Sequence, residues 1–211
     1  MELKVVIIDY GLGNIRSAKK SVVAAMHLNN LKGSVSLSSN FEAIKGASHI
    51  ILPGQGAFGS CINGLESLDG MIEELNNQVI IKKKPIFGIC VGMQLFANKS
   101  LEKGTHKGLG WIEGEILKLP SKNLILPHMG WNGIEIEKNH FVFDGLSLKN
   151  FYFVHSYYFN IVNKQNILAS ASYGIKFPAL ISKDNIYGAQ FHPEKSSDSG
   201  IKLLNNFLKI G

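Results

Sequence analysis

The feature that most constrains the fold is a series of short, unbroken apolar runs in the first half of the chain. Glycine turns or helical patterns separate these runs, which are KVVIID (4–9), VSL (35–37), SHIIL (48–52) and PIFGI (85–89). Continuous apolar strands joined by helical crossovers are typical of a parallel sheet that is covered on both faces. We therefore expect helices over 15–28, 68–82 and 91–99, the first of them capped by Asn14.

The second half of the chain has a different pattern. Its strand-like segments follow one another with turns between them, which favours hairpins over crossovers. A last helix is expected over 199–208, and no internal repeat or low-complexity linker separates the halves. The 211 residues suffice for one sizeable core. We predict a single α/β domain over 1–211, with a central, mostly parallel sheet, flanking helices and added antiparallel strands in the C-terminal half.

The formal net charge of +6 raises the question of nucleic acid as a partner. The densest basic run is Lys82-Lys83-Lys84, at the end of an expected helix, where cations suit the helix dipole. No groove-reading motif accompanies this run, so a solvated face is favoured over a nucleic-acid site. An acidic partner surface or an anionic metabolite stays open.

The N-terminus and the cysteines indicate the cellular compartment in which we expect the protein. The segment MELKVVIIDYG has neither the charged region nor the cleavage site of a signal peptide. No apolar run approaches the roughly 18 residues that a bilayer requires. Two cysteines, Cys61 and Cys90, cannot form a disulfide scaffold. We expect a cytoplasmic protein with no membrane partner.

The strongest chemical signal is GICVG (88–92), a G-x-C-x-G motif with an apolar strand before it and a helical pattern after it. The analogous G-x-S-x-G forms a nucleophile elbow in this context. A cysteine in such a turn lies at a helix N-terminus, which favours the thiolate, and the Val91 N–H is free to donate to an oxyanion. The alternative is that Cys90 is a buried small hydrophobic residue.

A thiol nucleophile requires a base, and His192 is the histidine with an obvious orienting carboxylate. In QFHPEKS (190–196) Glu194 follows two residues later, and alternate residues of an extended segment point the same way. Together with Cys90 these residues form a Cys-His-Glu triad by role. In isolation the pattern also fits an exposed ion pair in a turn. His155 is interpreted as a core histidine and His128 as a loop residue of uncertain role.

The loop PGQGAF (53–58) follows the third expected strand, and Gly54, Gly56 and Gly59 spell G-x-G-x-x-G. A dinucleotide fingerprint belongs to the first strand-to-helix turn, so its position argues against a nucleotide site. The loop is the leading candidate for the second oxyanion donor that an elbow needs. No cluster of histidine, cysteine and acidic residues has zinc-ligand spacing, so neither a metal nor a cofactor is expected.

These motifs resemble those of a known family. GICVGMQ and FHPEKS are similar to the class I, or triad, glutamine amidotransferases. DYGLGN (9–14), PGQGAF, PHMGWN (127–132) and FYFVHSY (151–157) narrow the resemblance to glutaminase subunits of imidazole glycerol phosphate synthase. The likeness extends from residue 9 to residue 196, and its implied fold is flavodoxin-like.

The resemblance implies that Cys90 attacks the side-chain amide of glutamine, that ammonia leaves, and that water releases glutamate from a thioester. His192 would move the protons. Ammonia would then pass to a cyclase subunit, a (β/α)8 barrel that forms a heterodimer with this chain and serves histidine synthesis.

The resemblance also assigns site residues. It implies an oxyanion strand at Gly54, Gln55 and Gly56, and a substrate-binding side chain at Gln94. Glu102 would hold the α-amino group of glutamine, and the backbone around Ser156 its α-carboxylate. The residues that would face the cyclase are Asn14, Met129, Trp131, Tyr152 and Lys195.

Gln55 departs from the family, which commonly has valine at this position, and it puts the resting orientation of the loop in doubt. Three alternatives remain at this point. They are a paralogous glutaminase that feeds a different synthase, such as one that modifies a cell-surface sugar, a scaffold with a dead site, and a cysteine hydrolase or nucleotide-binding module that acts alone.

Overall fold

A sheet that changes from parallel to antiparallel crosses the centre of the computed structural model, which describes residues 2–120, 122 and 124–210. Pairing is parallel from β2 to β14 and antiparallel from β14 to β9. In spatial order the strands are β2 (Gly33–Ser38), β1 (Leu3–Ile8), β3 (His49–Gly54), β4 (Ile86–Cys90), β14 (Ile186–Ala189), β13 (Ile175–Lys183), β12 (Ile167–Tyr173) and β9 (Glu135–Ile136). The predicted fold class is thereby confirmed.

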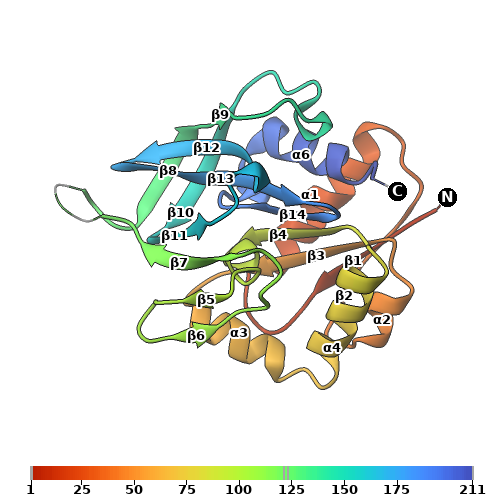
Figure 1. Ribbon diagram of the computed structural model, residues 1–211. Helices are drawn as coiled ribbons and strands as arrows, with labels where there is room; N and C mark the ends of the chain where they lie inside the picture. Colours follow the sequence, from red (N-terminus) through yellow and green to blue (C-terminus); the bar gives the residue numbers. More distant parts are fainter. Residues whose placement is uncertain (1, 121, 123, 211) are drawn as a thin grey trace.

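Two smaller sheets extend the C-terminal half. One contains the antiparallel pair β8 (His128–Gly133) and β10 (Asn150–His155). The strands of the other, in spatial order, are β11 (Tyr157–Ile161), β7 (Gly114–Lys118), β5 (Lys99–Ser100) and β6 (His106–Lys107). The β8–β10 pair and β11 lie beside the antiparallel strands, whereas β5 and β6 lie next to α3 (Figure 1).

Helices cover both faces of the parallel strands (Figure 1). On one face α1 (Ile15–Leu28) packs against α6 (Ser197–Phe207). On the other face lie α2 (Glu42–Lys45), α3 (Phe58–Glu66), α4 (Met71–Leu75) and the one-turn α5 (Val91–Gln94). A π-helix over Asn76–Ile81 continues α4, and short 3-10 helices cover Phe141–Phe143, Lys164–Asn166 and Pro193–Lys195.

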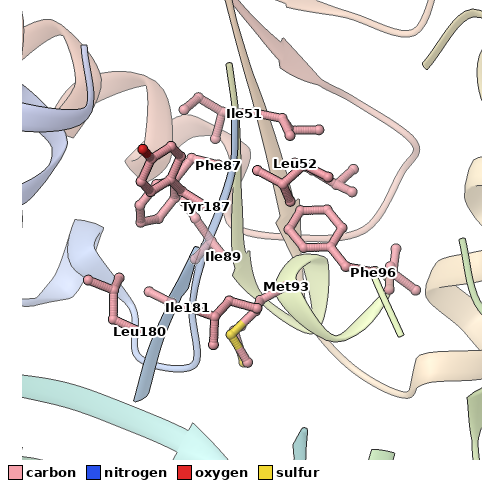
Figure 2. Packing of buried hydrophobic residues seen from close by; sticks show 14 of the residues in the cluster. Ile51, Leu52, Phe87, Ile89, Met93, Phe96, Leu180, Ile181 and Tyr187 are labelled. Carbon is pink, nitrogen blue, oxygen red and sulfur yellow. The ribbon is translucent and has the colours of Figure 1, made fainter. Parts of the chain in front are cut away.

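The core lies between these layers. Figure 2 shows Ile51 and Leu52 of β3 beside Phe87 and Ile89 of β4, with side chains of β13, β14 and α5 around them. These side chains are buried on both faces of the sheet, which explains why the strands are unbroken apolar runs in the sequence. This packing holds the strands in place, and it therefore also positions the residues that directly follow the strand ends.

Several expected helices differ from the observed ones. No helix was expected before residue 68, yet Phe58–Glu66 forms α3, because Phe58, Cys61, Ile62 and Leu65 have helical spacing and all are buried. The helix expected over 68–82 begins at Met71 and becomes a π-helix at Asn76.

The helix expected over 91–99 ends at Gln94. The backbone N–H groups of Phe96 and Ala97 bond three residues back, and that of Asn98 bonds Gly114, so the chain leaves the helix toward β5. Asn14 occupies the N-cap position of α1, but its side chain makes no capping hydrogen bond, so that prediction is wrong.

None of the helices in the described ranges has the length and apolarity that crossing a membrane requires.

Candidate active site

Three neighbouring parallel strands bring the predicted triad together. β3 ends at Gly54, β4 ends at Cys90, and His192 follows the end of β14 by three residues. The carboxyl ends of parallel strands meet at one edge of the sheet, which is where open α/β folds place their ligands. Residues far apart in the sequence therefore share one site.

The turn at Cys90 has the geometry of an elbow. Cys90 has φ 53° and ψ −109°, a conformation that non-glycine residues rarely adopt and that is commonly stored at functional sites. The flanking glycines allow α5 to approach the sheet. A Cβ at Gly88 would lie 2.7 Å from Met93 N, and one at Gly92 would lie 1.9 Å from Leu52 O. The elbow predicted from GICVG is present, although its helix is a single turn.

His192 and Glu194 form a buried pair behind the elbow. Their side chains are 3% and 2% exposed, and His192 Nδ1 lies 2.8 Å from Glu194 Oε1. The contact forms through the 3-10 turn Pro193–Lys195, not through the extended segment that was expected. His192 Nε2 has no hydrogen-bond partner among the described residues and is the nitrogen left to accept a proton.

The environment of His192 favours its charged form. Burial alone lowers the pKa of His192, but the negative charges of the Cys90 thiolate and the Glu194 carboxylate outweigh burial and raise the pKa well above its usual value. An imidazole that readily takes a proton beside a thiol is what a cysteine nucleophile requires.

Two side chains that the sequence analysis did not identify form hydrogen bonds with backbone carbonyls of the glycine loop. Tyr10 donates its hydroxyl to the Pro53 carbonyl at 2.6 Å, and the Cys61 thiol donates to the Gln55 carbonyl at 3.4 Å. Because N–H and C=O of a trans peptide point in opposite directions, the Gly56 N–H points away from Cys61. The Gln55 side chain is exposed.

A cavity of about 290 Å³ opens at this edge of the sheet, large enough for a small polar ligand. The predicted residues that line it are Gln55, Gly56, Cys90, Val91, Gln94, Glu102, Ser156 and His192. Gly54 and Glu194 lie behind this lining. Glu102 is fixed there because its Oε2 accepts the backbone N–H of Phe58, the first residue of α3, at 2.7 Å.

Two histidines of the second half, His128 and His155, are buried and hydrogen-bonded to each other. His128 was expected in a loop, but it lies in β8 and is buried. His155 Nδ1 donates to Tyr157 O at 2.9 Å, so its Nε2 accepts from His128 Nδ1 at 3.1 Å. His128 Nε2 then accepts from Asn132 Nδ2 at 3.2 Å. These contacts assign one neutral tautomer to each ring.

Buried neutral histidines make the stability sensitive to acid. Burial, only partly opposed by backbone carbonyls, lowers the pKa of His155 to about 3 and that of His49 to about 4. The unfolded chain binds these protons first, so stability is full above about pH 6.5 and is lost as the pH falls toward the folded values. From about pH 6.5 to about pH 5 we expect each ring to lower the free energy of unfolding by about 1.5 kcal/mol.

Urea unfolding at a series of pH values measures this loss. His49→Leu should flatten the acid slope, because it removes one buried ring, whereas His27→Gln should not, because His27 is exposed. An unfolding free energy that stays constant between these two pH values would contradict the expectation.

Three of the residues expected at a subunit interface, Trp131, Tyr152 and Lys195, lie close to one another. Met129 and Trp131 point outward from β8 and are 62% and 56% exposed. The Trp131 ring packs edge-on against Tyr152 of β10, with centroids 6.3 Å apart. Lys195 Nζ lies 5.7 Å from the centre of the Tyr152 ring. Asn14 is half-buried at the start of α1.

In the described part of the chain, no group of three or more histidine, cysteine or acidic side chains is placed to share a metal ion.

Comparison with known families agrees with this geometry. The family described as Glutamine amidotransferase class-I matches residues 6–210. The chain belongs to this family. Among the class-I glutamine amidotransferases, proteins named imidazole glycerol phosphate synthase subunit HisH are similar over nearly the whole chain. That of Brucella suis biovar 1 is 42% identical over 98% of this chain and 99% of its own length. Those of Rhodospirillum rubrum and Pelagibacter ubique are 41% and 40% identical, with coverage of at least 98% on both sides.

Solved structures share the fold of this glutamine amidotransferase. A crystal structure of a glutamine amidotransferase superposes with a TM-score of 0.73 and 18% identity, covering 98% of this chain and 99% of that one. A glutamine amidotransferase from Thermotoga maritima gives a TM-score of 0.55 and 17% identity, over 92% of this chain and 77% of that one. These likenesses support the fold, and the family match identifies the enzyme class.

Proposed function

We propose that this glutamine amidotransferase is the glutaminase subunit of imidazole glycerol phosphate synthase. The observation that carries the proposal is the cavity in which Cys90, on a strained elbow, meets the buried His192–Glu194 pair. The HisH relatives, similar over the full length, support the choice of synthase over a paralogous one.

The triad performs the hydrolysis as follows. His192 Nε2 takes the proton of the Cys90 thiol, and Glu194 holds the ring and stabilises its charge. The thiolate attacks the side-chain carbonyl carbon of glutamine. The resulting oxyanion accepts hydrogen bonds from the backbone N–H groups of Val91 and the glycine loop. His192 returns the proton to the leaving nitrogen, and ammonia departs. Water, deprotonated by His192, then cleaves the thioester to glutamate and regenerates the thiol.

Glu102 and Ser156 orient the substrate in this proposal. Glu102 presents its remaining carboxylate oxygen to the α-amino group, since Oε2 is held by Phe58 N. The backbone around Ser156 binds the α-carboxylate of glutamine. Both residues line the cavity.

We further propose that the surface of Met129, Trp131, Tyr152 and Lys195, with Asn14, contacts a cyclase subunit with a (β/α)8 barrel. Met129 and Trp131 expose apolar side chains on a strand whose other face is buried, and aromatic residues are enriched at interface centres. A free thiol nucleophile functions in a reducing compartment, which favours the cytoplasm.

A glutaminase assay with and without the cyclase subunit and its nucleotide ligand tests the proposal. We expect little glutamate from the chain alone and an increase of about a hundredfold in the complex with ligand, the effect of completing one oxyanion donor. Full turnover without partner or ligand would contradict partner dependence. Copurification with a different synthase would contradict the histidine pathway.

A further inference from the structure

Gln190 is a buried polar side chain that neither the motifs nor the mechanism above use. It lies directly after β14, two residues before His192, and is 0% exposed. Its Nε2 lies 3.7 Å from Cys90 Sγ, and its Oε1 lies 3.0 Å from Gln94 Nε2. A buried amide costs stability unless its groups are bonded, so both contacts constrain its orientation.

The direction of these bonds follows from Gln94. Gln94 Nε2 donates to Tyr157 O at 2.9 Å and to Gln190 Oε1 at 3.0 Å. A carbonyl oxygen only accepts, so Gln94 must present its NH₂ group to Tyr157, and Gln190 must in turn present its oxygen to Gln94. The NH₂ group of Gln190 therefore faces the sulfur.

Two consequences follow for the cavity. Both N–H groups of Gln94 are used inside the protein, so its Oε1 acceptor is the atom left for a ligand in the cavity that Gln94 lines. Cys90 Sγ accepts a hydrogen bond from the side-chain N–H of Gln190. A thiolate accepts such a bond more strongly than a neutral thiol does.

We propose that Gln190 stabilises the Cys90 thiolate through Nε2 and, through Oε1, fixes the amide of Gln94 so that it offers an acceptor to the substrate. The inference rests on the proposed role of Cys90 as nucleophile. Gln190 contacts the reacting sulfur but is not among the residues that line the cavity.

The pH dependence of Cys90 alkylation by iodoacetamide tests this role in the full chain. Mass spectrometry separates Cys90 from Cys61, the other cysteine. In Gln190→Met, which is similar in size but has no N–H, the midpoint of alkylation should rise by about one pH unit, and the rate near neutral pH should fall about tenfold. The matched control is Gln78→Met, since Gln78 is equally buried but bonds Glu74. Its midpoint should equal that of the wild type.

A second measurement needs no substitution at Gln190. In the wild-type chain the side-chain N–H resonance of Gln190 should titrate with the same midpoint as Cys90 alkylation, and Cys90→Ala should abolish that titration. An unmoved alkylation midpoint in folded Gln190→Met, or an N–H resonance that does not follow Cys90, overturns the proposal. Neither result would contradict the proposed function, which is tested separately by the glutaminase activity of Cys90→Ala and by the assay with the cyclase subunit.

Discussion

Replacing Cys90 with alanine is expected to abolish glutamine hydrolysis by the complex, a loss of at least about 10⁴-fold in kcat. The reason is chemical, because without the thiol no thioester can form, and the remaining groups supply only binding and oxyanion stabilisation. Steady-state glutamate formation in the presence of the cyclase subunit and its ligand measures the loss.

The same variant should retain synthesis when ammonia is supplied in place of glutamine. The proposal puts ammonia production in this chain and ammonia use in the partner, so the cyclase reaction is an internal control for assembly. Retained glutaminase turnover in Cys90→Ala would contradict the assignment of the triad. Loss of the ammonia-dependent reaction as well would indicate that the substitution disturbs the complex.

A Gly92→Ala substitution is expected to destabilise the chain by about 4 kcal/mol and to remove glutaminase activity. A Cβ at this position would lie 1.9 Å from Leu52 O and 3.2 Å from the carbonyl carbon of Pro53. Both atoms are backbone, so β3 and the glycine loop must move away from the elbow. Overpacking of a buried backbone contact is among the mechanisms that give the largest single-substitution effects.

Gly46→Ala is the matched control for Gly92→Ala. Gly46 has an ordinary helical conformation at the end of α2, and a Cβ there would meet no atom within 4 Å. Thermal and urea unfolding should show little change for Gly46→Ala and a large loss for Gly92→Ala. Equal unfolding curves for the two variants would show that the elbow can shift without cost.

Local sequence patterns predicted the central part of the fold. The apolar runs at β1, β3 and β4 are buried strands, and the glycine after Cys90 is required where α5 touches β3. The pattern was informative because continuous burial demands continuous apolar sequence and because a sharp turn demands small residues on both sides.

The same reasoning failed where tertiary contacts override local signals. Glycines of the PGQGAF loop suggested that the loop continued, whereas α3 starts at Phe58 and buries one face of its first turns. The pattern after Cys90 indicates a longer helix, but α5 ends after one turn because the backbone carbonyls of residues 95–97 accept N–H groups of residues 109, 112 and 110. His128 seemed to belong to a loop because its strand partner, β10, lies more than twenty residues further along the chain.

For the candidate site, the sequence by itself determined the identities of Cys90, His192 and Glu194, because an elbow motif and a His-Pro-Glu turn are local. Their arrangement was decided by the adjacency of β4 and β14, which places two distant segments at one sheet edge, with the glycine loop after β3 beside them. The contacts of Gln190, Tyr10 and Cys61 with the site became visible only in the tertiary structure. Their contacts join residues separated by 100, 43 and 6 positions, and hydrogen bonds of such polar side chains depend on packing that no short pattern encodes.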